Sequence, residues 1–283
     1  NMNAFGNLGI SNLSLAEDVE YGYMLTLDFI NGTISMYQNY LRWPQPICDA
    51  NGCTPLPKLT EADIPSDAAI IWASKSFLDK YNIDISSYGE PKVDSSWKIW
   101  YARSADMGQE QTIPDVYTIT YPILLDGKAI YEEGGMYRGL TLSYDIRAKR
   151  VTGMYGIEKT ELQKSSYKLL KDTDLIQQMI KNGSRYISPD MPLDKNRKVV
   201  ELKLGEPTLE YVHIYGEWKN GKSDEYFVPA YVFPVESAPK EGFVSQTITI
   251  PLVEEFVQKI NPGPMDPIIY STKPAIEPAV IKE

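Results

Sequence analysis

The stretch Gly139–Ile157 reads GLTLSYDIRAKRVTGMYGI and alternates between apolar and polar residues on either side of a charged centre. In its first half, apolar residues stand at every second position: Leu140, Leu142, Tyr144 and Ile146. Alternation with period two places these residues on one face of a sheet and the polar residues between them on the other. The centre, 147–150, is Arg-Ala-Lys-Arg and is too charged for a core, and the apolar pattern resumes at Val151. The stretch therefore predicts two short strands joined by a polar turn.

A second copy of this pattern lies near the N-terminus. Gly22–Ser35 aligns without a gap on Gly139–Thr152, with identities at Gly22/Gly139, Leu25/Leu142 and Asp28/Asp145. In the first copy the turn holds Asn31-Gly32, which is typical of a two-residue hairpin turn because both residues tolerate positive φ. We interpret the pair as an internal repeat. The alternative is that any two amphipathic hairpins look alike.

The composition is that of an ordinary globular protein, with 43% hydrophobic and 23% charged residues. Its 283 residues suffice for one large domain or two ordinary ones. The net charge of −10 argues against nucleic acid and anionic lipid as partners, since both require clustered Lys and Arg. The 20 tyrosines are typical of β-structure with amphipathic surfaces, and the alternative is a stacking surface for sugars or peptides.

No apolar run approaches the roughly 18 residues of a membrane span. The first residues, NMNAFGNLGI, do not have the basic and apolar regions of a signal peptide. We expect 1–20 to be a polar lead-in, the end of a linker or of a missing segment.

The two cysteines, Cys48 and Cys53, enclose Asp-Ala-Asn-Gly. A tight turn at Asn51-Gly52 could bring the thiols within reach of each other, and we predict a disulfide that closes a surface loop, 44–57. The spacing is not that of a C-x-x-C redox pair, and two Cys with one His are too few for a zinc site. A disulfide implies an oxidising, extracytoplasmic compartment, whereas the alternative is two idle thiols in a cytosolic protein.

The order of elements predicts an α+β fold of two repeated units, each a helix packed on an antiparallel meander of about four strands. The first unit, 21–160, holds the N-terminal hairpin, the cysteine loop, a helix that begins after Pro65-Ser66-Asp67, and strands. We expect strands at 97–102 and 115–125, and a polar, mobile loop at 104–114 between them.

The second unit, 161–260, repeats that order. Thr173 is expected to cap its helix, and Asn182-Gly183 to end it. Strands are expected near Val200–Leu204, 209–215, 226–235 and 244–252, with a turn at Asn220-Gly221. Pro229 inside a strand argues for an edge or a bulge. The segment 261–283 is rich in Pro and predicts an extended tail.

The doubled helix-and-meander order, the G-x-x-L-x-x-D hairpins and the segment 226–233, YFVPAYVF, together resemble the PepSY-like group. Within that group the style is similar to that of the YycH/YycI regulators, extracytoplasmic proteins that restrain a sensor kinase. The resemblance covers about 21–252 and implies binding or regulation outside the cytoplasmic membrane without catalysis. Those regulators have a membrane anchor that this sequence lacks, and the group has no catalytic signature to carry over.

The search for chemistry-bearing motifs is negative for the P-loop, the G-x-S-x-G elbow and H-E-x-x-H. His213, the single histidine, lies between Val212 and Ile214 without an accompanying nucleophile, so a structural histidine is favoured over a catalytic one. Glu132-Glu133 before Gly134-Gly135 could supply paired carboxylates for glycoside chemistry, but adjacent residues point apart, and a solvated turn is favoured. Asp28 and Asp145 each end a strand, where Asp hydrogen-bonds the local backbone.

We therefore predict a non-catalytic extracytoplasmic protein, secreted, periplasmic or lipoprotein-like, without cofactor, metal or catalytic residues. It would engage a protein or peptide partner through a sheet face or edge. The alternative is a cell-wall-directed hydrolase of unfamiliar type that uses carboxylates. A deep pocket lined by converging carboxylates or His213 would favour the hydrolase, and a shallow groove lined by tyrosines would favour the binding protein.

Overall fold

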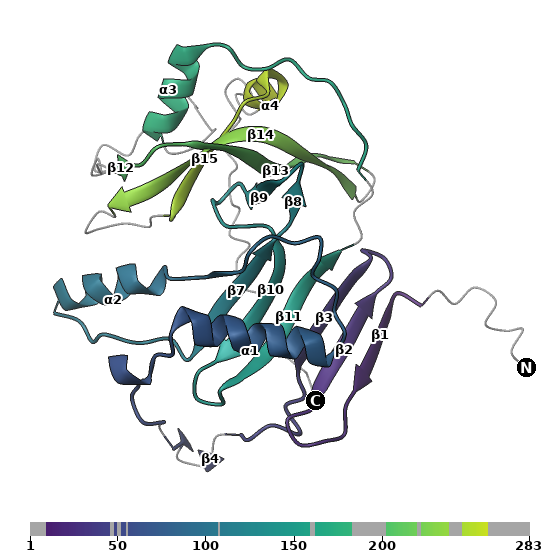
Figure 1. Ribbon diagram of the computed structural model, residues 1–283, viewed down its shortest axis with the longest axis vertical. Helices are drawn as coiled ribbons and strands as arrows, with labels where there is room; N and C mark the ends of the chain where they lie inside the picture. The colour runs from purple at the N-terminus through teal and green to yellow at the C-terminus, as the bar shows by residue number, and fades with distance from the viewer. Residues whose placement is uncertain are drawn as a thin grey trace, which may run out of the picture.

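The computed structural model describes residues 10–45, 48–49, 52–54, 56–106, 108–158, 162–182, 202–219, 222–237 and 245–259. Residues 1–9 of the predicted lead-in, the Asn220-Gly221 turn, Val200 and the predicted tail lie outside these residues, whereas residues 12–16 of the lead-in form a strand. The described chain has the predicted α+β class, with two sheets that are mainly antiparallel and a few helices (Figure 1). No helix of the described residues is long and apolar enough to cross a membrane.

The first sheet has the strand order β1-β2-β3-β11-β10-β7-β6, and every pairing in it is antiparallel. Its strands are β1 (Asn12–Ala16), β2 (Tyr23–Asp28), β3 (Thr33–Gln38), β6 (Lys92–Val93), β7 (Val116–Pro122), β10 (Gly139–Asp145) and β11 (Arg150–Glu158). The two hairpins from the sequence comparison, β2-β3 and β10-β11, lie side by side in this sheet because β3 pairs with β11.

The turns of these two hairpins have the same local structure. Asp28 Oδ1 accepts hydrogen bonds from the N–H groups of residues 30 and 31, at 2.9 and 3.0 Å, and Asp145 Oδ1 accepts from residues 147 and 148, at 2.7 and 2.8 Å. The last residue of each turn has positive φ, +67° at Gly32 and +53° at Lys149. The prediction for the Asp side chains is therefore confirmed. The two-residue Asn31-Gly32 turn is wrong, since the loop between Asp28 and Thr33 has four residues and Asn31 has no positive φ.

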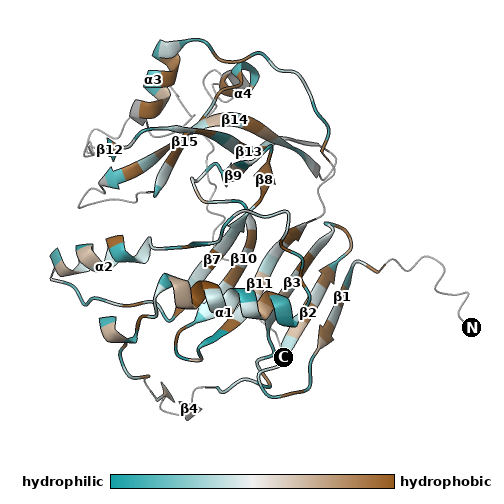
Figure 2. Ribbon diagram, in the orientation of Figure 1, coloured by the Kyte–Doolittle hydropathy of each residue, from teal (hydrophilic) through white to brown (hydrophobic). Residues whose placement is uncertain are grey.

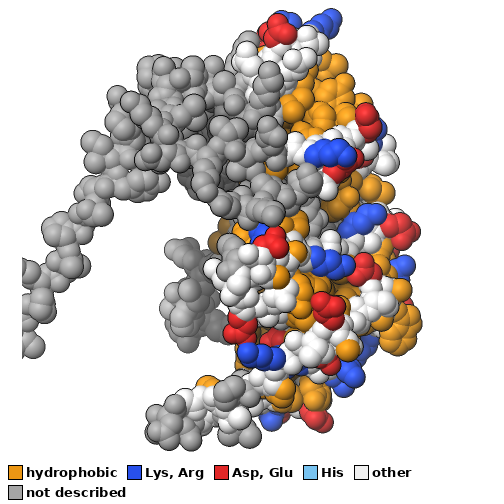
Figure 3. Space-filling view, turned by 90° about the vertical axis from the view of Figure 1, so that its left-hand side faces the viewer, with side chains coloured by type: hydrophobic (Ala, Val, Ile, Leu, Met, Phe, Trp, Pro, Cys, Tyr) orange, Lys and Arg blue, Asp and Glu red, His pale blue; other side chains and the backbone are white. Residues whose placement is uncertain are grey.

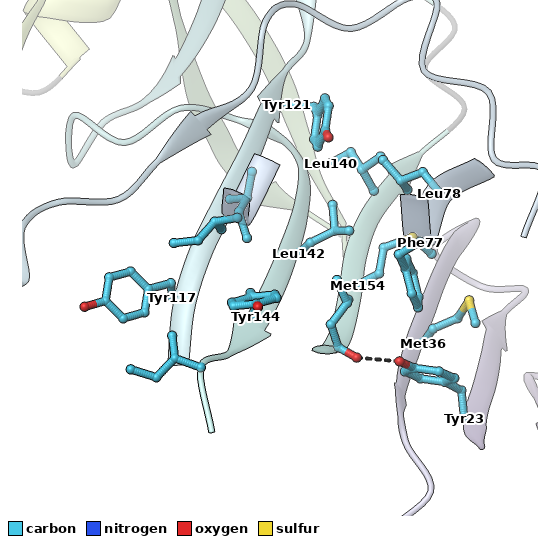
Figure 4. Packing of buried hydrophobic residues seen from close by; sticks show 14 of the residues in the cluster. Tyr23, Met36, Phe77, Leu78, Tyr117, Tyr121, Leu140, Leu142, Tyr144 and Met154 are labelled. Atoms are coloured by element: carbon cyan, nitrogen blue, oxygen red, sulfur yellow. Dashed lines mark hydrogen bonds between the residues drawn. The ribbon is translucent and has the colours of Figure 1, made fainter. Parts of the chain in front are cut away.

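The helix α1 (Asp67–Lys80) lies across the first sheet and forms the main core with it (Figure 1). It begins as predicted, with the Ser66 side chain accepting a hydrogen bond from the N–H of Ala69. Its buried residues Ile70, Phe77 and Leu78 pack on the alternating residues of β7, β10 and β11, among them Ile119, Leu140, Leu142 and Met154 (Figure 4). Figure 2 shows these hydrophobic segments along α1 and the strands beneath it. The apolar residues of the period-two alternation thus lie on one face of the sheet, as the sequence predicts.

Several tyrosines belong to this core. Tyr23 makes edge contacts with the rings of Trp43 and Phe77, and its hydroxyl donates a hydrogen bond to the C=O of Val151 (Figure 4). Tyr121 is buried and its hydroxyl lies 2.7 Å from Ser74 Oγ. These tyrosines are therefore packing residues of a sheet, in agreement with the prediction that the tyrosines belong to β-structure with amphipathic surfaces.

The segment 97–102 is not the strand expected from its aromatic residues. It belongs to the helix α2 (Trp97–Asp106), which also takes up the first part of the expected loop 104–114. Asp94 Oδ1 accepts a hydrogen bond from the N–H of Ser96 just before the helix, and Trp97 and Tyr101, four residues apart, make an edge-to-face contact. The aromatic residues of this segment are thus in contact at the four-residue spacing of a helix and do not follow the two-residue spacing of a strand. Figure 3 shows the side of the molecule that carries the end of α2, where hydrophobic side chains lie among side chains of both charges.

The second sheet has the order β12-β14-β13-β9-β8, and β15 also pairs with β14. Its strands are β8 (Leu124–Leu125), β9 (Lys128–Glu132), β12 (Lys203–Leu204), β13 (Thr208–Lys219), β14 (Lys222–Ser237) and β15 (Thr247–Pro251). The pairing of β9 with β13 is parallel. β8 and β9 come from within the predicted first unit, so the second sheet contains strands from both sides of residue 160. The described sheets are compatible with two helix-on-sheet units, as predicted, but they have seven and six strands in place of about four, because periodicity does not show pairing between distant strands.

The helices α3 (Thr173–Asn182) and α4 (Glu254–Lys259) pack on the second sheet (Figure 1). Met179 of α3 contacts a cluster that includes Ile248 and Ile250 of β15, and Phe256 of α4 contacts Val212. The cap of α3 is Asp172, whose Oδ1 accepts from the N–H groups of residues 174 and 175, so the assignment of Thr173 as the cap is wrong by one residue. The helix ends at Asn182, as predicted.

Pro229 lies within β14, opposite Tyr211 of β13 and one residue before the pairing with β15 begins at Ala230. Its C=O accepts a hydrogen bond from the N–H of Leu252, so its ring nitrogen also faces the β15 side. The missing N–H therefore leaves the ladder to β13 intact. The prediction of an edge position is correct for one side of the strand.

Cys48 and Cys53 face each other in a short ladder formed by β4 (Cys48–Asp49) and β5 (Gly52–Cys53). Their sulfur atoms are at disulfide distance. A short 3-10 helix, η2 (Glu61–Asp63), separates this loop from α1.

Candidate functional site

His213 lies on β13 and is fully buried. Val212 and Ile214 pack against Phe256 of α4, so alternation along the strand directs the imidazole to the opposite face. There Nδ1 lies 2.9 Å from Oε2 of Glu132, which is the residue opposite His213 on β9. Nε2 lies 2.9 Å from Oε2 of Glu225 on β14, out of line for a hydrogen bond. One imidazole thus faces two carboxylates.

Arg138, just before β10, completes this cluster of four charged or titratable side chains. Its Nη1 lies 2.8 Å from Oε1 of Glu132 and its Nη2 lies 3.3 Å from Oε2 of Glu225. The guanidinium also lies over the ring of Phe227, 6.0 Å from its centroid. Arg138 therefore bridges both carboxylates, and the charges of the cluster compensate one another.

Glu132 is held as a carboxylate. Burial raises the pKa of its side chain, but the hydrogen bonds from His213 and Arg138, with their charges, outweigh burial and leave the pKa below its usual range. A carboxylate with a lowered pKa is a poor general acid. The arrangement fits a structural ion cluster better than an acid and base pair.

The turn after Glu132 is held by Ser245 and by Thr247, the first residue of β15. Ser245 Oγ and Thr247 Oγ1 donate to the C=O groups of Gly134 and Gly135, both at 2.6 Å. Gly135 has φ +83°, and a Cβ there would lie 2.4 Å from the C=O oxygen of Thr247. The turn that the sequence predicts to be solvated is exposed at Gly134 and Met136, whereas Gly135 is buried against Thr247.

A groove of about 950 Å³ lies beside the cluster. Among the described residues, the segment 162–167 and residues 224–229 of β14 line it, together with Leu125 and Asp126. Three tyrosines line it, Tyr167, Tyr211 and Tyr226, and Tyr167 contacts Phe256. Glu225 belongs both to the groove and to the cluster, whereas His213 does not line the groove. The segment 162–172 runs along the side of the second sheet toward α3 (Figure 1).

The structure brings His213 and Glu132 together, 81 positions apart, but Glu133 contributes only its C=O, which accepts from Thr249 Oγ1 at 3.1 Å. Asp28 and Asp145 stay in their turns, away from this cluster. Sequence reasoning missed Arg138 and Glu225. The sequence signals that could have indicated them were a charged residue just before a predicted strand, for Arg138, and a charged residue beside an aromatic strand segment, for Glu225. Within the described ranges, no group of three or more His, Cys, Asp or Glu side chains is arranged to hold a metal ion.

No family model and no curated protein matches the chain. Among solved structures, the chain is similar to the Bacillus megaterium YpeB C-terminal domain, at 13% identity and a TM-score of 0.32, over 88% of this chain and 92% of that one. It is also similar to an uncharacterised protein from Eubacterium rectale, at 11% identity and a TM-score of 0.30, over 88% and 75%.

Proposed function

We propose that this protein is a non-catalytic, PepSY-like regulator that binds a protein or peptide partner outside the cytoplasmic membrane, in the style of YycH and YycI. The observation that carries the proposal is the groove between 162–167 and 224–229, which three tyrosines line. Tyrosines supply large, rigid contact area and are enriched where proteins bind proteins.

The charged cluster supports binding over hydrolysis. The Glu132 carboxylate is occupied by His213 and Arg138, and the imidazole is shielded from the groove. A hydrolase would need a carboxylate free to reach a bound substrate. The cluster instead fixes Glu225 at the wall of the groove.

The extracytoplasmic location is supported by the cysteine pair, whose sulfur atoms lie at disulfide distance. Stable disulfides are typical of oxidising compartments. A kinase or another membrane-anchored partner is a further part of this proposal, and it rests on the resemblance in the hairpins and in the segment 226–233.

The test uses the full chain against a displayed random-peptide library and against purified cell-wall polymer. We expect the chain to enrich peptides that bind it saturably and are recovered uncleaved after elution. Release of soluble sugar or peptide fragments from the polymer, abolished by Glu132→Gln, would overturn the proposal in favour of the hydrolase. A catalytically inert chain that also enriches no peptide would overturn it as well.

A further inference from the structure

β14 has an open edge along its first part, from Ser223 to Val228. On one side it pairs with β12 and β13, and on the other it pairs with β15 only from Ala230 to Pro234. In the described part of the chain, no strand pairs with the second side from Ser223 to Val228. An unpaired strand edge is a template for another extended chain.

The main-chain groups of this edge can be assigned from its paired half. The N–H of Leu252 donates to the C=O of Pro229, and the N–H of Val235 donates to the C=O of Gln246, each at 2.8 Å. Every second residue of a strand points its N–H and C=O to the same side. Glu225 and Phe227 therefore direct theirs to the open edge, and Pro229, which has no N–H, ends it.

The groove is lined by the open part of β14 and by the exposed segment 162–167, together with Tyr211 of β13 and the residues Leu125 and Asp126. Its volume of about 950 Å³ is at the upper end of the range for ligand pockets. A space of this size beside an unpaired strand edge can hold an extended peptide.

The charges lining the groove select the occupant. Asp126, Asp224 and Glu225 line it, of which Glu225 is paired with Arg138, and Lys164 is the one cation among the described lining residues, in a chain of net charge −10. Acidic walls attract Lys and Arg side chains and disfavour acidic partners. The tyrosines between them can take apolar or cationic side chains on their ring faces.

We propose that a basic, extended segment of a partner protein adds to β14 as a further strand along Ser223–Val228. This inference rests on the proposed function and names its surface and the chemistry of its partner. Main-chain hydrogen bonds to Glu225 and Phe227 would give affinity, and the acidic residues of the groove would give preference for basic sequences.

The probe is a short synthetic peptide in which lysine alternates with valine, titrated into the full chain by calorimetry. We expect saturable binding that is lost when glutamate replaces lysine. Two N-methylated versions of the peptide are compared, one methylated at the odd-numbered amides and one at the even-numbered amides. One of them should bind about tenfold more weakly or worse, and the other nearly as well as the parent peptide, because only one of the two sets of amides faces β14. Amide hydrogen exchange should slow at Glu225 and Phe227 when the peptide is bound.

Asp224→Lys should raise the Kd about fivefold or more, the equivalent of an exposed ion pair, and Glu20→Lys is the control with the same change of charge outside the groove. The inference would be overturned if Asp224→Lys and Glu20→Lys changed the Kd equally, or if the two N-methylated peptides bound equally well. If the lysine–valine peptide does not bind while library peptides do, the inference fails and the proposed function stands. A dimer of the chain that the peptide dissociates would assign the edge to a second copy instead.

Discussion

The carboxylate of Glu132 accepts a hydrogen bond from Nδ1 of His213 at 2.9 Å, across the parallel pairing of β9 with β13. This pairing joins a strand from the first half of the chain to the second sheet. The ion cluster built on it fixes both the junction of the sheets and Glu225 at the groove.

Replacement of His213 should destabilise the fold. His213→Ala removes the hydrogen bond to Glu132 and leaves two carboxylates to share Arg138, so we expect a loss of about 2–4 kcal/mol in the free energy of unfolding. Urea denaturation measures it. In a double-mutant cycle with Glu132→Ala, the two losses should not add, with a coupling of about 0.5–3 kcal/mol. Simple additivity would contradict the contact.

The lowered pKa of Glu132 should make stability depend on pH in the acid range. The folded state holds the carboxylate, so the unfolded state binds more protons as pH falls below the ordinary value of 4.5. The stabilisation is present above that value and is lost as pH falls through the folded pKa. Denaturation at a series of pH values should show a smaller acid loss in Glu132→Gln than in the native chain. Parallel curves would refute this role for Glu132.

Alanine substitutions at two glycines with similar φ angles distinguish the cost of a steric clash from the cost of a positive φ. Gly135 and Gly127 have φ of +83° and +77°, but a Cβ meets the Thr247 C=O at 2.4 Å at the first and nothing within 4 Å at the second. Gly127→Ala should cost about 1 kcal/mol and Gly135→Ala about 2–4 kcal/mol in thermal or urea denaturation. Similar losses would mean that the turn is not packed under β15.

The hydroxyl of Tyr23 should contribute to stability apart from its ring. Tyr23→Phe keeps the contacts with Trp43 and Phe77 but removes the hydrogen bond to Val151, and we expect a loss of about 1 kcal/mol. The exposed Tyr40 is the control, where Tyr40→Phe should change the free energy of unfolding by less than about 0.5 kcal/mol. A loss no larger than that of the control would exclude the hydrogen bond.

The Cys48–Cys53 pair should give a small stabilisation, because the loop that it closes is short. The chain-entropy estimate for a separation of 5 residues is about 2 kcal/mol. Denaturation with and without reductant should show a difference of at most this size, absent in Cys48→Ser/Cys53→Ser. Two thiols that react freely in the untreated native chain would contradict the disulfide.

Local patterns were sufficient for part of this fold. The alternation in Gly139–Ile157, the serine cap of α1 and the Asp residues of the twin turns act through neighbours within a few residues, and the structure has them where they were predicted. The aromatic segment 97–102 was wrong because strand and helix patterns are hard to distinguish over six residues.

The sequence by itself determined the class of the fold, its hairpins and its first helix, because propensity and periodicity are properties of adjacent residues. Only the tertiary structure decided that β9 pairs with β13, that His213 meets Glu132, Arg138 and Glu225, and that β14 keeps an open edge beside a groove. These features arise from contacts between residues far apart in the chain, where burial and the pairing of charges, rather than local preference, select the partner.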